Sequence, residues 1–155
     1  MANTIDWGKI YCFSHWGDDS NKLSVPEFPE FCALIQAQCG TQYTYSGNQD
    51  YPERYVFNLG VTGTSTLTYE AYDVPDKWVI IQDGNILLDT GYRGSNDFQS
   101  FLNDALAERG LPPETIQGIG QGTAQFTVNS LSPVYVYVYA PISGTLFETT
   151  ISCPT

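Results

Sequence analysis

The chain offers no recognisable set of residues for nucleophilic or acid–base catalysis. His15 is the single histidine among 155 residues, so a Ser-His-Asp or Cys-His site would have to use it. Cys12 lies three positions before His15, but aromatic residues surround the pair, which favours a docking segment over a catalytic site. The sequence contains no Gly-x-Ser-x-Gly motif to expose a serine nucleophile on a sharp turn. We therefore expect a protein that is not an enzyme.

Metal-binding side chains are present but are not spaced as compact sites. Zinc requires about four nitrogen or sulfur ligands, and the candidates, which include no Cys-x-x-Cys pair, are Cys12, His15, Cys32 and Cys39. Calcium prefers clustered oxygen ligands, and the candidates are Asp73, Asp76, Asp83 and Asp89, and separately Asp18 and Asp19. Asp73 and Asp76 flank a Val-Pro pair, where aspartate commonly bonds its own backbone, so turn formation is the favoured interpretation. Nothing marks two of these acids as a glycosidase pair. No phosphate-binding glycine motif occurs either, and we expect no metal and no cofactor.

Aromatic residues are the unusual feature of the composition, with 11 Tyr, 8 Phe and 3 Trp. Between positions 134 and 139, valine alternates with Tyr135, Tyr137 and Tyr139. In a strand this pattern places a β-branched face toward a core and a stripe of tyrosines on the other face. Tyrosine suits interfaces because its large apolar ring carries a hydroxyl that tolerates water. The stripe would face a partner subunit, stack on sugar rings, or lie under a helix, and the sequence leaves all three open.

A second aromatic group lies in the first 20 residues and consists of Trp7, Tyr11, Phe13 and Trp16. A short arm cannot bury four aromatic side chains by itself, and leaving each in water forgoes roughly 1.5–3 kcal/mol. We expect this N-terminal arm to pack on another chain or on its own domain, with another chain favoured. Deleting residues 1–20 is expected to leave a folded domain that no longer attaches to its partner.

Turn signals separate short apolar runs after residue 60, a pattern typical of strands. Residues 64–71 alternate as a half-buried strand does, and Asp83-Gly84 between two apolar runs is a strong hairpin signal. Further strands are predicted over residues 123–128, 134–140 and 146–151. The residues expected to be mainly buried between two sheets are Leu67, Tyr69, Val79, Ile81, Leu87, Phe126, Val128, Val134, Val136 and Val138.

Helical spacing appears at two places. An apolar stripe from Phe98 to Leu106 predicts a helix near 97–109, with Ser95 at its start and Arg109 and Gly110 at its end. Residues 29–38 are also helically spaced, although the apolar run at 31–35 fits a buried strand as well. The whole pattern predicts a mainly β protein: residues 1–60 form an arm and an irregular segment, and residues 61–155 form an antiparallel β-sandwich with one inserted helix.

Charge and the N-terminal sequence exclude several classes of partner. Six Lys and Arg against 17 Asp and Glu give a net charge of −11, which argues against binding nucleic acid or an anionic membrane. No apolar run approaches the 18 or more residues of a membrane-spanning helix. The first residues show no basic segment followed by an apolar one, which favours retention in a cytosol. We therefore expect Cys12, Cys32, Cys39 and Cys153 to be thiols, with an oxidised pair as the alternative if the protein leaves the cell.

Several motifs carry a resemblance to a known module. They are the segment 72–80, Asp83-Gly84, the Leu-Asp-Thr-Gly at 88–91, the segment 136–145 and the final Cys153-Pro154. Together they resemble a jelly-roll-like β-sandwich module of bacterial and cyanobacterial surface proteins and of phage virion proteins. The chain departs from that module where residues 95–117 insert a helix, which could build a subunit contact or displace a ligand site. The opening residues 1–12, with Trp16-Gly17-Asp18, resemble the start of small structural proteins of tailed phages.

These resemblances imply a non-enzymatic structural protein of a tailed-phage particle, most simply an outer capsid cement (decoration) protein. Such a protein would be a homotrimer that contacts the major capsid protein or another virion protein, synthesised in the host cytoplasm and placed on the outer surface of the virion. The alternative is a carbohydrate-binding module or adhesin for a host surface glycan. A glycan site should show an exposed Trp or Tyr beside Asn, Asp or Arg in one groove.

Overall fold

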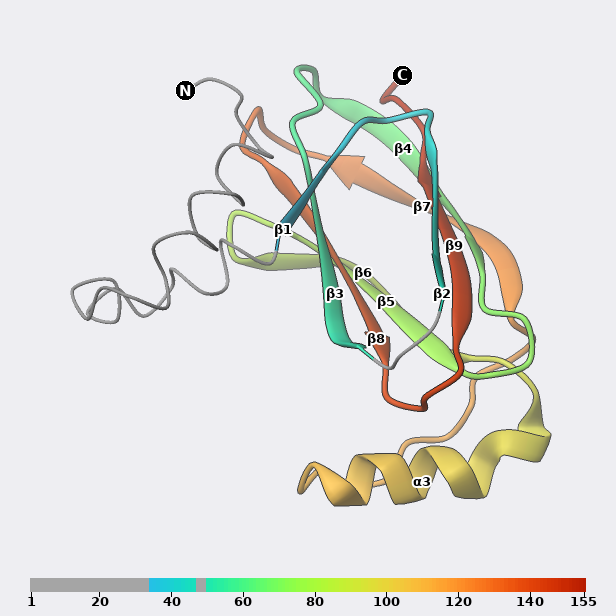
Figure 1. The fold of residues 1–155 in the computed structure, drawn as a ribbon. Helices are drawn as coiled ribbons and strands as arrows, with labels where there is room; N and C mark the ends of the chain where they lie inside the picture. The colour runs from blue at the N-terminus through green and yellow to red at the C-terminus, as the bar shows by residue number, and fades with distance from the viewer. Residues whose placement is uncertain (1–33, 47–49) are drawn as a thin grey trace, which may run out of the picture.

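The computed structural model describes residues 34–46 and 50–155, which form two facing β-sheets (Figure 1). The five-stranded sheet has the order β1 (Leu34–Ala37), β3 (Asp50–Phe57), β8 (Val134–Ala140), β5 (Asp76–Gln82) and β6 (Asn85–Arg93). The four-stranded sheet has the order β2 (Gln42–Ser46), β9 (Leu146–Ile151), β4 (Gly63–Glu70) and β7 (Gln121–Val128). The pairings are antiparallel except that of β1 with β3, which is parallel. The predicted β-sandwich is confirmed.

The core lies between the two sheets and follows the predicted alternation. Val134, Val136 and Val138 of β8 are fully buried, whereas the tyrosines between them are half-buried. At the centre the indole Nε1 of Trp78 donates a hydrogen bond to Thr149 Oγ1 at 2.8 Å. This bond satisfies the one polar atom of the largest buried side chain, which would otherwise be costly to bury.

Strand β5 directs toward the core the face opposite to the one expected. Val79 and Ile81 were predicted to face the core, but β5 directs Trp78 and Ile80 inward. The register decides this, because Trp78 pairs with Val138 and Ile80 with Val136, and directly paired residues share a face of the sheet. Val79 is buried as predicted, but on the other face of β5, whereas Ile81 and Leu87 are half-buried. The remaining residues predicted for the core are buried.

The sandwich begins earlier in the chain than the sequence indicated. Residues 34–57, assigned above to an irregular segment, supply β1, β2 and β3 to both sheets. Residues 34–37 form a strand and not part of a helix, so the boundary at residue 61 does not separate the sandwich from another unit. Residues 1–33, including the expected arm, lie outside the described residues.

The predicted hairpin and helix are present. Asp83 and Gly84 have φ angles of 54° and 77°, as both turn positions of a two-residue hairpin require. A 3₁₀ turn, η2 (Asn96–Phe98), leads into α3 (Gln99–Glu108), and Ser95 Oγ accepts a hydrogen bond from the Asp97 amide at 3.2 Å. Gly110, with a φ of 74°, ends the helix. Helix α3 lies at one end of the sandwich (Figure 1), and no helix among the described residues is long and apolar enough to cross a membrane.

The expectation of free thiols is wrong for two of the cysteines. Cys39 and Cys153 form a disulfide with a Cα–Cα distance of 4.9 Å. Cys39 lies in the turn between β1 and β2, and Cys153 follows β9, to which β2 is paired. The Gly40 amide donates to the Ile151 carbonyl at 2.7 Å, so backbone pairing brings the two cysteines together. Cys12 and Cys32 lie outside the described residues.

Candidate ligand groove at one end of the sandwich

The tyrosine stripe lies on the outer face of the five-stranded sheet, where Tyr135, Tyr137 and Tyr139 are half-buried. Tyr139 packs against the apolar cluster beneath α3, and Lys77 Nζ lies 5.2 Å from the centre of its ring. The interpretation that a helix covers the stripe is therefore correct for the Tyr139 end. The other predicted interface residues, Trp7, Tyr11, Phe13 and Trp16, lie outside the described residues.

The aspartates considered as calcium ligands do not gather at one place. Among the described residues, no group of three or more His, Cys, Asp or Glu is arranged to hold a metal ion. Asp83 accepts a hydrogen bond from the Ser130 hydroxyl at 2.7 Å, and this bond lowers the pKa of Asp83. Asp89 accepts from the Gly91 amide at 2.9 Å. Both aspartates therefore stabilise turns, as the favoured interpretation expected. Asp18 and Asp19, like Cys12, His15 and Cys32, lie outside the described residues.

Asp76 is fully buried at the start of β5. The Thr145 hydroxyl lies 2.8 Å and 2.9 Å from its two carboxylate oxygens. Burial raises the pKa of Asp76 well above its ordinary value, although the Thr145 hydrogen bond acts in the opposite direction. This acid is inaccessible to a ligand and belongs to the core.

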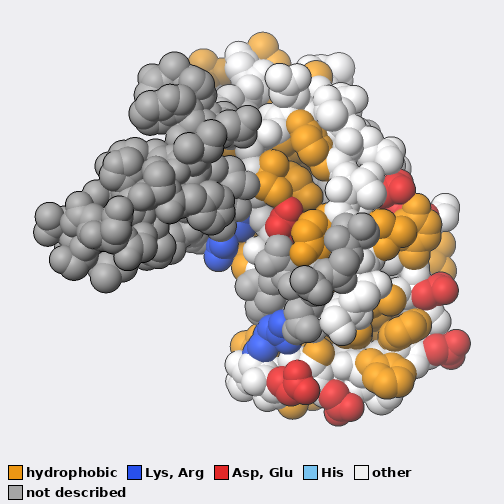
Figure 2. Space-filling model, in the orientation of Figure 1, with side chains coloured by type: hydrophobic (Ala, Val, Ile, Leu, Met, Phe, Trp, Pro, Cys, Tyr) orange, Lys and Arg blue, Asp and Glu red, His pale blue; other side chains and the backbone are white. Residues whose placement is uncertain are grey.

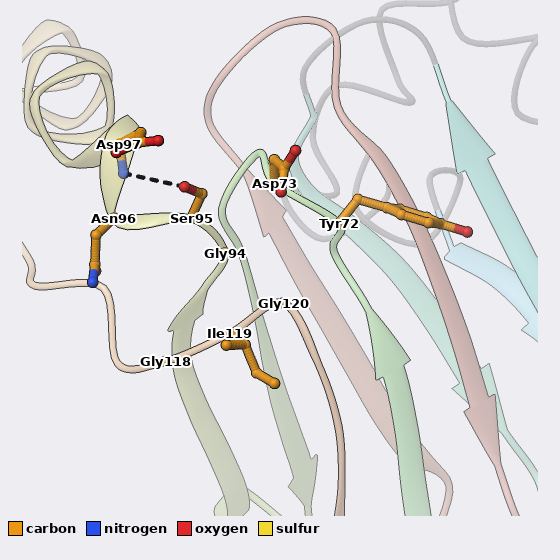
Figure 3. A pocket seen from close by; sticks show the side chains of 9 residues that line it. All are labelled: Tyr72, Asp73, Gly94, Ser95, Asn96, Asp97, Gly118, Ile119 and Gly120. Atoms are coloured by element: carbon orange, nitrogen blue, oxygen red, sulfur yellow. Dashed lines mark hydrogen bonds between the residues drawn. The ribbon is translucent and has the colours of Figure 1, made fainter.

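A groove opens where three connecting segments meet near the start of α3 (Figure 3). A hollow of about 490 Å³ is lined by Tyr72, Asp73, Gly94, Ser95, Asn96, Asp97, Gly118, Ile119 and Gly120. A second hollow of about 310 Å³ adjoins it, is lined by four of the same residues, and extends to Glu70 and Gln121. The two hollows together form one groove.

Backbone hydrogen bonds join the three segments. The Ala71 amide donates to the Gly120 carbonyl at 2.8 Å, the Gly94 amide to Gly118 at 2.9 Å, and the Ser95 amide to Asp73 at 2.8 Å. Glycine is needed at two of these positions. A Cβ on Gly120 would collide with the Tyr72 backbone, and one on Gly94 would lie 2.8 Å from the Asp73 carbonyl oxygen. The floor of the groove therefore depends on close backbone approach.

Tyr72 is held in a conformation that costs free energy. Its φ of 58° lies in the left-handed region, which non-glycine residues rarely adopt. Two carboxylates fix it there: Glu70 accepts from the Tyr72 amide at 2.8 Å, and Glu148 accepts from the Tyr72 hydroxyl at 2.7 Å. The hydrogen bond to Glu148, followed by partial desolvation and the nearby negative charges, raises the pKa of Tyr72. The ring remains 44% exposed and points away from the segment 95–97 (Figure 3).

Three polar side chains in the groove differ from these two glutamates because they have no protein partner. Within the described part of the chain, the side chains of Asp73, Asn96 and Asp97 form no hydrogen bond or ion pair. Ile119, which is 70% exposed, adds an apolar surface beside them. The groove thus combines two exposed apolar side chains with unengaged acceptors, a combination suited to holding a small polar ligand.

Comparison with known proteins gives similarity of fold alone. No family model matches the chain, and no curated protein sequence matches it. The pre-peptidase C-terminal domain of a Bacillus anthracis collagenase shares 14% identity with a TM-score of 0.49, covering 77% of this chain and 94% of that domain. The copper-binding surface protein CorA of Methylomicrobium album BG8 shares 11% identity with a TM-score of 0.42, covering 79% and 100%. A family 6 carbohydrate-binding module shares 11% identity with a TM-score of 0.36, covering 77% and 97%.

The groove residues were not singled out by the sequence, apart from Asp73 as a turn or calcium candidate. Two sequence features could have pointed to them. One is the glycines at 94, 118 and 120, which mark close backbone approach, and the other is the polar pair Asn96-Asp97 at the start of a helix. Neither signal shows that the three segments meet.

Proposed function

We propose that this protein is a non-catalytic carbohydrate-binding module whose groove recognises a glycan. The observation that carries the proposal is the exposed ring of Tyr72 at the smaller hollow, which is also lined by the exposed Ile119 and by Asp73, whose carboxylate has no partner among the described residues. This is the arrangement set out above for a glycan site. It favours the alternative over the capsid protein as the first assignment.

The chemistry of the groove suits a sugar ring. A pyranose has apolar C–H faces and hydroxyl groups around its edge, so it needs an apolar contact with hydrogen-bonding groups at the side. Tyr72 and Ile119 offer the apolar contacts. Hydrogen bonds from sugar hydroxyls to the carboxylate of Asp73 would be charge-assisted and therefore strong.

The fixed conformation of Tyr72 supports the same function. Backbone strain at a non-glycine residue persists only where surrounding contacts enforce it, and such positions cluster at binding sites. Here Glu70 and Glu148 hold the backbone and the hydroxyl of Tyr72. A ring that is already ordered loses less conformational entropy when a ligand binds.

The disulfide supports a place of action outside a reducing cytosol, because disulfides persist mainly in oxidising environments. A glycan-binding module on the outer surface of a cell or of a particle would meet that condition. We propose the outer surface of a virion as the location of the protein, after synthesis in the host cytoplasm.

Glycan binding is tested with an array of oligosaccharides, followed by isothermal titration calorimetry of the best ligand. The wild-type protein should bind, and Tyr72→Ala should weaken binding by about tenfold or more, as loss of a buried aromatic contact does. Phe101→Ala is the matched control, because Phe101 is an exposed aromatic side chain on α3 that does not line the groove. Melting curves of both variants separate loss of binding from loss of fold. The proposal would be rejected if no glycan on the array bound the wild-type protein, or if Tyr72→Ala and Phe101→Ala weakened binding equally.

A structural role in a tailed-phage particle is retained as the second proposal. The observation that favours it is the apolar outer face around Tyr135, Tyr137 and Ile81, which are half-buried and lie beyond the end covered by α3. As a cement protein the chain would be a trimer seated on the major capsid protein. Light scattering and co-sedimentation with assembled capsids test this role. A monomer that stays in the supernatant would reject it.

A further inference from the structure

Strand β7 is an edge strand that lacks the features by which edge strands usually avoid pairing with another chain. Of the other edge strands in the described sheets, β1 and β2 have only four and five residues. β6 shifts register against β5 and carries Asp89 and Arg93. β7 has eight residues, none of them charged or proline, and pairs with β4 without a bulge. A long, regular and uncharged edge is a template for a further strand.

The backbone groups of alternate β7 residues point out of the sheet edge. On β4, the Thr66 amide donates to Ser152 Oγ at 2.8 Å, and the Thr66 carbonyl accepts from the Ser152 amide at 2.9 Å. Thr66 therefore turns its backbone groups away from β7, so its pair with Gln125 is one without hydrogen bonds. Because the two kinds of pair alternate along the ladder, the outward amides and carbonyls belong to the exposed residues Gln121, Thr123, Gln125 and Thr127. No described residue hydrogen-bonds to these backbone groups.

Two copies of β7 complement each other in one antiparallel register. With Ala124 opposite the Ala124 of a second copy, Gln121 lies opposite Thr127, and Thr123 lies opposite Gln125. This register gives every outward amide of both copies an outward carbonyl as its partner. Thr and Gln side chains then face each other across the two-fold axis, and no like charges are opposed.

Charge limits where a second copy can approach. Each chain has a net charge of −11, so two copies repel each other over much of their surface. β4 and β7 together carry Glu70 as their single charged side chain. Figure 2 shows acidic side chains at the end of the molecule that carries α3 and uncharged side chains over the opposite end, where β4 begins and β7 ends. Pairing along β7 therefore joins two uncharged strips.

We infer that two copies of this chain associate by antiparallel pairing of their β7 strands, which joins the two four-stranded sheets into one. This association does not depend on glycan binding. Gln121, the first residue of β7, also lines the smaller hollow. The two grooves would therefore lie at opposite ends of the paired strands, roughly 20 Å apart along them. A dimer of this kind would present two sites to a polymeric ligand.

Sedimentation equilibrium over a concentration series measures the association. The mass of the wild type should rise from that of one chain, 17.2 kDa, toward that of two chains between micromolar and millimolar concentrations. Gln125→Pro should stay at the mass of one chain, because proline is tolerated on an edge strand but cannot donate the outward hydrogen bond. Gln125→Ala is the matched control, since it shortens the same side chain, keeps the amide, and should dimerise as the wild type does.

A second pair of variants keeps the test decisive if proline disturbs the strand. Thr123→Glu with Gln125→Glu places like charges directly opposite each other in the dimer and should prevent its formation. The control, Gln42→Glu with Thr44→Glu, adds the same charge at exposed positions of β2, the other edge of the same sheet. It should still dimerise at physiological ionic strength, where distant charges are screened. Melting curves show that each variant is folded.

Amide hydrogen exchange of the wild type, at low and high protein concentration, gives a readout specific to this register. The amides of Thr123, Gln125 and Thr127 should exchange more slowly in the dimer. Those of Ala124 and Phe126, which already face β4, should not change. The inference is overturned by a mass that stays at one chain or reaches three, by a dimer that survives Gln125→Pro or the Thr123, Gln125 double variant, or by protection without this alternation.

Discussion

Removing the disulfide is a quantitative test of how much the crosslink between the β1–β2 turn and the end of β9 stabilises the fold. Cys39 and Cys153 are separated by 114 positions. The chain-entropy relation for a loop of that length gives about 4.8 kcal/mol of stabilisation at 25 °C, because the crosslink restricts the unfolded chain. Domains of this kind are stable by roughly 5–15 kcal/mol in total. The variant Cys39→Ser, Cys153→Ser should therefore lose a large share of the folding free energy and still fold.

Urea unfolding of the wild type and the variant measures the loss. We expect a decrease of about 3–5 kcal/mol with a lower midpoint, and a fall in melting temperature of about 10 °C or more. Each single variant, Cys39→Ser or Cys153→Ser, should lose as much as the double variant, because either change removes the same bond. Additive losses would instead indicate that the two side chains contribute through packing.

Two results would refute the reasoning. The first is a double variant within about 1 kcal/mol of the wild type, which would mean that the crosslink hardly restricts the unfolded chain. The second is alkylation of both Cys39 and Cys153 in denatured protein before reduction, which would show that the bond is absent. Peptide mapping without a reductant should instead recover the two peptides joined.

Three further predictions concern the core and the groove. Asp76→Asn should be more stable than the wild type at neutral pH. Burial raises the pKa of Asp76 in the folded protein above the unfolded value of about 3.9. The protonated Asp76 therefore stabilises the fold below about pH 3.9, and this stabilisation is lost as pH rises through the folded pKa. If the wild type and Asp76→Asn had equal unfolding free energies at every pH from about 4 to 8, this prediction would be contradicted. Gly120→Ala brings a Cβ against the Tyr72 backbone and should cost about 1–3 kcal/mol with loss of glycan binding; unchanged melting and binding would count against the described floor. Val136→Asp should cost several kcal/mol, since it buries an unpaired charge; a normally melting variant would disprove the burial of that position.

The strands that the sequence predicted well are those whose two faces carry different residue types. In β8 the alternation of valine and tyrosine fixes both the strand and its inward face, and the structure has the same bounds. Asp83-Gly84 fixes the hairpin because both residues adopt positive φ. In β5 the run Trp-Val-Ile-Ile is apolar on both faces, so only pairing with β8 decides which side chains enter the core. Pattern alone cannot supply that register.

The early strands and the disulfide depend on contacts that are distant in sequence. β1 pairs with β3 in parallel and β2 pairs with β9, more than a hundred residues later. Residues 29–38, which overlap β1, carry an apolar pattern that fits a helix as well as a strand. The N-terminal sequence predicted that the cysteines are free thiols, yet the pairing of Cys39 with Cys153 follows from the meeting of β2 and β9.

The inserted segment 95–117 explains why the groove replaces the tyrosine stripe as the candidate site. Its two ends, Gly94-Ser95 and Gly118, are joined by backbone hydrogen bonding and form two of the three walls of the larger hollow. Between those ends, α3 folds back and packs its buried residues with Tyr92 and Tyr139. The same insertion therefore occupies one end of the outer sheet face and builds a new polar recess beside Tyr72. Binding sites on β-sandwiches commonly lie in loops held by a rigid scaffold, and here the insertion supplies the loops while the close approach of Gly94 and Gly120 to their neighbours fixes their spacing.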